Sequence, residues 1–217
     1  ENIDAVVVAT VTEKPNLVMY WNGEIIVDLE RAFLDTNGVR VVVDANVVDS
    51  DVNVPEERTT SAATLEADTV AVLSDLNHAS QKGLQTIFDS SVGRSTVNHP
   101  LGGRYQITPT EASVQKLPVQ HGVTNTASVM AQGFNPYIAE WSPYHGAAYA
   151  VIEATARLVA AGANWSKARF SYQEYFQRMD KQAARFGQPV AALLGSIEAQ
   201  IQLGLPSIGG KDSMSGT

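Results

Sequence analysis

Leu205-Pro-Ser-Ile-Gly-Gly-Lys-Asp-Ser213 follows directly on a stretch whose apolar residues recur at spacings of three and four. That spacing predicts an amphipathic helix over 189–203, and Gly204 is a typical residue to close it. The short apolar run Leu205–Ile208 then leads into Gly209-Gly210, and paired glycines predict a turn. The turn would place a cation, a carboxylate and a hydroxyl close together at the end of a helical unit.

The Gly-Gly-Lys-Asp-Ser sequence has the composition of a phosphate and metal site. Paired glycines allow the backbone amides of Gly209 and Gly210 to approach an oxyanion closely. Lys211 supplies a point charge, and Asp212 supplies a hard oxygen ligand for Mg²⁺. The same composition is also that of an ordinary turn, because glycine tolerates positive φ and Asp and Ser bond nearby amides. Composition alone leaves both interpretations open.

A P-loop is excluded by the spacing of the glycines. That motif needs a glycine five residues before the second glycine and Ser or Thr directly after the lysine. The two positions hold Leu205 and Asp212 instead.

The composition of the 217 residues is that of a soluble globular protein, with 44% hydrophobic and 18% charged residues. A formal net charge of −8, with no run of Lys and Arg, argues against a nucleic acid partner. The chain has no cysteine, so disulfides, thiolate metal sites and a cysteine nucleophile are excluded. Apolar runs are shorter than the roughly 20 residues of a membrane span, and we expect a cytoplasmic protein. Both ends of the sequence look cut from a longer polypeptide.

The first part of the chain is expected to be β-rich. Val6–Val11 is uninterrupted and largely β-branched, and Val39–Val43 is similar. Asn22-Gly23 between two apolar runs is a strong hairpin signal. Polar, proline-broken residues 49–61 predict a linker, so we expect residues 1–48 to be the β-rich tail of a preceding domain. The apolar residues of 62–78 recur at helical spacing, which predicts a helix there.

Residues 62–217 are expected to form one α+β domain with a mostly antiparallel sheet and helices on one face. Pro143 stands where a first helical turn begins, and the apolar spacing predicts a helix that ends near Gly162. The other expected elements are strands at 104–108, 112–119, 123–131 and 167–172, and helices at 173–186 and 189–203.

An ordered set of motifs runs from about residue 84 onward: Phe88-Asp-Ser-Ser-Val-Gly-Arg-Ser-Thr96, Leu117-Pro-Val119, Gly133-Phe-Asn-Pro136, Ser142-Pro-Tyr-His-Gly-Ala147, Glu153-Ala-Thr-Ala-Arg-Leu158, Gly162-Ala163 and Gly209-Gly-Lys-Asp-Ser-Met-Ser-Gly216. Together, in this order, they resemble the phosphoribosylformylglycinamidine synthase family, in its large single-chain type. The resemblance implies the second of two aminoimidazole ribonucleotide synthetase-like N-terminal modules. Its sheet would pair with that of the first module.

The resemblance implies a glutamine-dependent amidoligase of purine biosynthesis that uses ATP and Mg²⁺. The full enzyme activates the amide oxygen of formylglycinamide ribonucleotide with ATP, and ammonia released from glutamine gives the amidine. The remainder of the polypeptide, including the first module and a glutaminase domain, is the implied partner. The isolated chain would have no synthase activity, and pairing of its exposed sheet as a homodimer is an open question.

The resemblance also assigns residues by position. Gly209, Gly210 and Lys211 would contact ATP, and Ser213 the substrate. Lys211 stands where shorter relatives carry a metal-ligating Asn, and because a cation cannot ligate Mg²⁺, it would touch phosphate directly. Asp212 would ligate the metal.

Three further positions have a second, structural interpretation. Arg94 and His145 are candidates for substrate phosphate, yet a surface arginine after a turn and a histidine at a helix start are ordinary features. Glu153 matches a metal-ligating carboxylate, but Arg157 at i+4 explains it as an ion pair. His121 and Arg157 both depart from the ligands of some large relatives, which argues against their auxiliary nucleotide site. The competing function is a non-catalytic pairing module.

Overall fold

The computed structural model describes residues 3–36, 38, 42–49, 60–88 and 95–216. The chain divides into two compact units, Glu1–Val43 and Asp44–Thr217, and each is described by itself. The predicted linker at 49–61 falls mostly outside the described residues, as does most of the predicted strand at 39–43. The predicted domain boundaries therefore stay predictions.

The first unit contains the expected hairpin. Strands β1 (Asn16–Trp21) and β2 (Glu24–Glu30) pair antiparallel, and the short helix α1 (Arg31–Leu34) follows. Asn22 and Gly23 both have positive φ, at 49° and 86°, as a two-residue turn between twisted strands requires. Val6–Val11, expected to be extended and paired, forms no strand and is exposed. A β-branched run needs a neighbouring strand to form a ladder.

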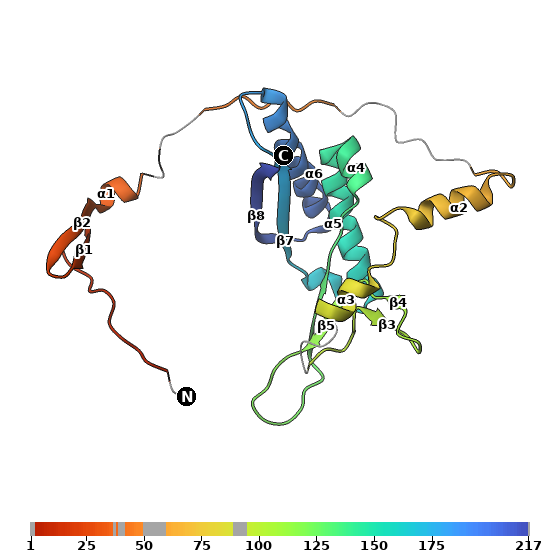
Figure 1. Cartoon of the computed structure of the whole chain (residues 1–217), viewed down its shortest axis with the longest axis horizontal. Helices are drawn as coiled ribbons and strands as arrows, with labels where there is room; N and C mark the ends of the chain where they lie inside the picture. Colours follow the sequence, from red (N-terminus) through yellow and green to blue (C-terminus); the bar gives the residue numbers. More distant parts are fainter. Residues whose placement is uncertain (1–2, 37, 39–41, 50–59, 89–94, 217) are drawn as a thin grey trace. The chain divides into compact units, whose positions relative to one another are not determined.

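The second unit mixes helices with short strand pairs (Figure 1). Two of the three strand pairs among the described residues of this unit are antiparallel and none closes into a barrel, so the expected α+β class with a mostly antiparallel arrangement is confirmed. Its helices are α2 (Leu65–Ser74), α3 (Lys82–Phe88), α4 (Pro136–Trp141), α5 (Pro143–Ala160), the 3₁₀ turn η1 (Trp165–Lys167) and α6 (Ala183–Leu203). Its strands are β3 (Leu101–Gly102), β4 (Thr108–Pro109), β5 (Ala112–Lys116), β6 (Ala127–Ala131), β7 (Phe170–Gln177) and β8 (Ser207–Gly216).

The long helix α5 begins and ends where the sequence indicated. The buried Ser142 caps it, since its side chain accepts from the His145 amide, and Pro143 occupies the first turn. Gly162, with φ 81°, lies two residues beyond the last helical residue. Gly204 closes α6 in the left-handed conformation, with φ 66°. These local predictions are confirmed because each of these residues meets a requirement of the backbone at a helix end.

The predicted helix at 173–186 is wrong over its first part. Strand β7 runs on to Gln177, and the continuous helix α6 does not begin until Ala183. Along β7, part-buried Tyr172, Glu174 and Phe176 alternate with exposed neighbours, which is the period of a strand. Pro189 lies buried inside α6, where tertiary packing outweighs its missing amide.

The expected strand at 104–108 is also wrong. Gly103 and Gln106 have positive φ, at 78° and 51°, so this segment turns between the two-residue strands β3 and β4. The other two expected strands are present but shorter, as β5 and β6, which pair antiparallel from Ala112 with Ala131 to Lys116 with Ala127. The helix expected at 62–78 is present as α2.

The core lies between α5, α6 and the start of β7. Val151 on α5 and Leu205 after α6 are 1% and 3% exposed, and Ala154, Phe170 and Ala199 complete the cluster. Figure 1 shows α5 and α6 close together, and they pack against each other with β6 and β7 beside them. Among the described residues, no helix is long and apolar enough to cross a membrane.

Candidate functional site

The Gly-Gly-Lys-Asp-Ser segment is a strand and not the expected turn. It forms the middle of β8, which runs parallel to β7 and is connected to it through α6. Gly210 lies opposite Tyr172, Lys211 opposite Gln173, and Asp212 opposite Glu174. Gly209 has φ 140° and lies where the register between β7 and β8 shifts. The positive φ, which glycine tolerates, therefore belongs to this irregularity in the strand pairing.

Close approach of two strands accounts for Gly210. A Cβ atom added to Gly210 would lie 2.7 Å from the carbonyl oxygen of Tyr172, nearer than side chains approach backbone. In this structure the absence of a side chain at Gly210 therefore lets β7 approach β8 closely. From the sequence, the same glycine was expected to let a phosphate approach the backbone.

The side chains of Lys211 and Asp212 project from opposite faces of β8, because successive strand residues alternate. The Lys211 ammonium lies 6.0 Å from the ring centroid of Tyr175, on the exposed face. Asp212 lies opposite Glu174, and its negative charge helps to raise the pKa of Glu174. Ser213 shares a hydrogen bond with Ser215, their hydroxyl oxygens 3.2 Å apart. The structure does not bring Lys211 and Asp212 to one face.

Tyr172 and Glu174, two residues apart on β7, form a polar pair that the sequence did not reveal. Tyr172 Oη and Glu174 Oε2 are both shielded from solvent and have no hydrogen-bond partner among the described residues. Burial, and then the Glu174 charge, raise the pKa of Tyr172 to about 12. Burial, followed by the charge of Asp212, also raises the pKa of Glu174 above its usual 4.5. The pair is costly to keep without a partner.

Replacement of Glu174 by Gln is expected to stabilise the protein at neutral pH. Because its folded-state pKa is raised, the wild-type loses stability as the pH rises from about 4.5 through that pKa. The variant cannot titrate, and we expect a gain of about 1 kcal/mol at pH 7 because the residue is only partly buried. Urea unfolding at pH 7 and at pH 3 measures the difference, which should vanish at the lower pH because the carboxyl is then protonated in both the folded and the unfolded state. A gain of equal size at both would show that charge is not the cause.

Glu153 is held in a network of structural contacts. Its Oε2 accepts from the Phe134 amide at 2.7 Å, and its Oε1 lies 2.9 Å from the Arg157 guanidinium. Arg157 also bonds the Gln132 carbonyl at 2.8 Å, and its Nε lies 2.5 Å from Glu111. The i, i+4 ion pair considered from the sequence is therefore present. Both carboxylate oxygens of Glu153 are in use.

A metal ion is not accommodated by the described residues alone. They contain no group of three or more His, Cys, Asp or Glu side chains that could hold one. Glu153 lies on α5 within its ion-pair network, and Asp212 lies on β8. Asp212 and Glu153 as metal ligands therefore remain predictions that need ligands from elsewhere.

His145 lies in the first turn of α5 among aromatic rings. Its Nδ1 is 2.8 Å from the Ser142 hydroxyl, and its ring centroid is 4.9 Å from Trp141 and 5.2 Å from Tyr144. These contacts suit the structural interpretation, and a substrate contact stays untested. Arg94 lies outside the described residues. His121 lies exposed in the segment between β5 and β6.

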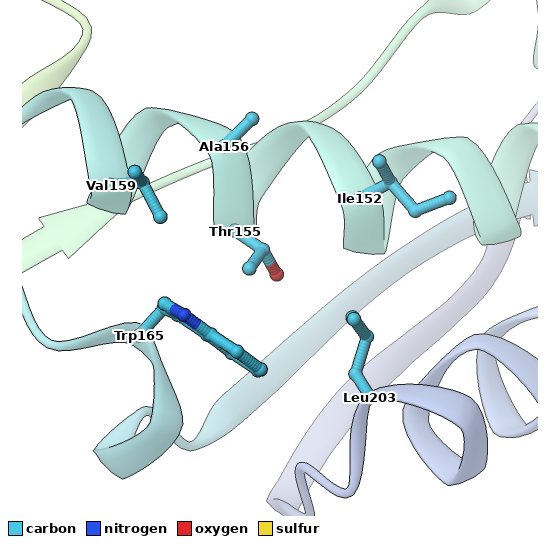
Figure 2. Close-up of a pocket in the computed structure, with 6 residues that line it drawn as sticks. All are labelled: Ile152, Thr155, Ala156, Val159, Trp165 and Leu203. Carbon is cyan, nitrogen blue, oxygen red and sulfur yellow. The ribbon is translucent and has the colours of Figure 1, made fainter.

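Two cavities lie near these residues. The larger, about 1560 Å³, is lined by β6, the α4–α5 junction, β7 and α6, and His145 is the one predicted site residue in the described part of the chain that lines it. The smaller, about 220 Å³, is lined by Ile152, Thr155, Ala156, Val159, Trp165 and Leu203 (Figure 2). The Thr155 hydroxyl already donates to the Val151 carbonyl at 2.8 Å, so the small pocket is apolar in character.

Comparison with known proteins gives a distant, partial similarity. No family model matches the chain. The chain is 29% identical over 164 residues to the phosphoribosylformylglycinamidine synthase subunit PurL of Thermococcus sibiricus, and 29% identical over 165 residues to that of Deinococcus radiodurans. These matches cover 75% and 74% of the chain and 20% of each relative. The chain thus spans about a fifth of the curated relatives it matches. Both are named as subunits, so the similarity is to PurL and not specifically to the large single-chain type.

Proposed function

We propose that the chain is part of an ATP-dependent ligase that converts formylglycinamide ribonucleotide, glutamine and ATP to formylglycinamidine ribonucleotide. The observation that carries the proposal is the 29% identity with PurL subunits over three quarters of the chain. The ordered motifs between residues 88 and 216 support it. The protein would act in the cytoplasm, in purine biosynthesis.

Strand β8 would supply the nucleotide contacts in this proposal. Gly209 and Gly210 would contact the nucleotide, and Lys211, exposed on β8, would meet a phosphate. Ser213, Arg94 and His145 would contact the substrate. Asp212 and Glu153 would contribute to Mg²⁺ only alongside ligands from outside the described residues, since Mg²⁺ requires near-octahedral oxygen coordination.

The chemistry that the protein must support is displacement at an amide carbon. Conversion of the amide oxygen to a phosphate ester makes it a good leaving group, which ammonia then displaces. The charge of the transferred phosphoryl group needs positioned cations, and Lys211 would be one. Because the chain has no cysteine, a cysteine-dependent glutaminase must lie in another part of the enzyme. We expect the 217 residues alone to catalyse neither synthase nor glutaminase turnover.

Calorimetric titration of the chain with ATP and Mg²⁺ tests the proposal. We expect saturable binding that Lys211→Ala weakens at least about tenfold, because a charge-assisted phosphate contact is lost. Lys167→Ala, at an exposed lysine in η1, is the matched control and should leave the affinity unchanged. Equal affinity of the Lys211→Ala variant and the wild type would contradict the assignment of Lys211.

A non-catalytic pairing module is the second candidate. The observation that favours it is Gly210, whose small size is accounted for by the approach of Tyr172 on β7. In that case the glycines serve strand packing and neither the wild type nor any variant binds nucleotide. The calorimetric titration therefore distinguishes the two functions.

A further inference from the structure

One face of the β7–β8 pair carries Lys211 together with two exposed side chains of β7. Gln173 and Tyr175 are two residues apart on β7, so they lie on the same face. In the parallel register Gln173 lies opposite Lys211, and Tyr175 lies opposite Ser213. Tyr175 therefore lies beside the two residues of β8 to which the proposed function assigns a nucleotide phosphate and the substrate.

The Lys211 side chain is held by an aromatic ring and not by an opposite charge. Its ammonium makes no ion pair with any residue that the structure describes. The ammonium lies 6.0 Å from the centroid of the Tyr175 ring, within the range in which a ring face attracts a cation. An exposed lysine has a flexible four-carbon stem and loses side-chain freedom when it binds a phosphate. A ring that already holds the ammonium near one position reduces that loss.

The ring of Tyr175 is itself oriented by a hydrogen bond. Gln173 Nε2 donates to Tyr175 Oη at 2.9 Å. Because the Tyr175 residue is 70% exposed, packing alone does not fix its ring, and the bond from Gln173 supplies a second point of attachment. Gln173, Tyr175 and Lys211 thus form a chain of contacts on one face, from amide to hydroxyl and from ring to ammonium.

We propose that Tyr175 is a positioning residue that holds the Lys211 ammonium ready for a nucleotide phosphate. The inference rests on the proposed function, in which Lys211 meets the phosphate. Gln173 orients the ring, the ring face attracts the ammonium, and the ammonium then has less side-chain freedom to lose when phosphate binds. Tyr175 acts through Lys211 and makes no contact of its own with the nucleotide.

The contact itself is measured by NMR on the 217-residue chain without nucleotide. The ring current of Tyr175 should shift the Cε protons of Lys211 upfield. Tyr175→Leu should remove the shift, and Tyr175→Phe should keep it because the ring remains. Unshifted Cε protons in the wild type, or a shift that Tyr175→Leu leaves unchanged, would overturn the proposal whether or not nucleotide binds.

Calorimetric titration with ATP and Mg²⁺ measures the consequence for binding. Tyr175→Leu should weaken binding about threefold, the size expected for loss of an exposed cation–π contact, and Tyr175→Phe should stay within about twofold of the wild type. In the Lys211→Ala background Tyr175→Leu should have no further effect, because the two residues act as one unit. A further loss in that background would show that Tyr175 contacts the nucleotide itself, and would overturn the positioning role.

Tyr105→Leu is the matched control, because it removes a similar contact in the turn between β3 and β4. There the Arg104 guanidinium lies 5.6 Å from the centroid of the Tyr105 ring, and Tyr105 is 72% exposed. The control should leave the affinity for ATP unchanged, and thermal unfolding of each variant verifies that it is folded. No binding by the wild type, or equal binding by Lys211→Ala, would contradict the proposed function and this inference with it. Binding that Lys211→Ala weakens and Tyr175→Leu does not would overturn this inference alone.

Discussion

Gly195→Ala is expected to lower the free energy of unfolding by about 2–3 kcal/mol, although alanine is the better helix former. Gly195 is buried in the middle of α6, where a Cβ atom would overlap the carbonyl oxygen of Tyr144 on α5. Backbone cannot move aside as a flexible side chain can, so the two helices must separate. Urea unfolding followed by circular dichroism measures the change.

Gly83→Ala is the control for the helix propensity of the same substitution. Gly83 lies in α3, and a Cβ atom there would meet nothing within 4 Å. Alanine should be neutral or stabilising by up to about 1 kcal/mol at such a site. If both substitutions stabilise the protein, the close contact between α5 and α6 is not present in solution.

Arg157→Met is expected to cost about 2 kcal/mol of stability. Methionine keeps the apolar stem but removes the donors to Glu153, Glu111 and the Gln132 carbonyl. Loss of one partner from a fully buried ion pair costs about 3–5 kcal/mol, and the value here is smaller because Glu111 is largely exposed. Amide hydrogen exchange at Phe134 should also accelerate, since Arg157 orients the carboxylate that holds this amide.

Arg31→Met provides the comparison for a plain surface pair. Arg31 and Asp35 are also i and i+4, at 3.3 Å, but both side chains are well exposed. Such a pair contributes less than about 1 kcal/mol. An equally small effect at Arg157, with unchanged exchange at Phe134, would show that the network does not hold the segment after β6.

Local signals predicted the elements that are determined by their own residues. Asn22-Gly23, Pro143 and Gly204 each satisfy a local turn or helix terminus, and each lies where expected. Strand β7 was partly taken for a helix because the alternation of polar and aromatic residues breaks at Glu174 and Tyr175, where the charged residue is part-buried and the aromatic one is exposed. The period of two becomes decisive only when the burial of Tyr172, Glu174 and Phe176 is known.

The candidate site was harder to predict because it depends on non-local pairing. Gly209–Ser213 has turn composition, yet β7, more than thirty residues earlier, supplies a parallel partner for its backbone. That pairing also separates Lys211 from Asp212, which adjacent positions in a turn would have kept together. The unpartnered atoms of Tyr172 and Glu174 carry no sequence signal beyond their spacing of two.

The most direct test of the proposed function locates the nucleotide on the chain. Titration of Mg²⁺ and ATP into the ¹⁵N-labelled protein, followed by NMR, should give saturable shifts that are largest at the amides of Gly209–Ser213 on β8. The shifts should be strongly reduced in the Lys211→Ala variant. Absence of shifts at saturating nucleotide, or shifts confined to other elements, would contradict the assignment of β8 to a nucleotide site.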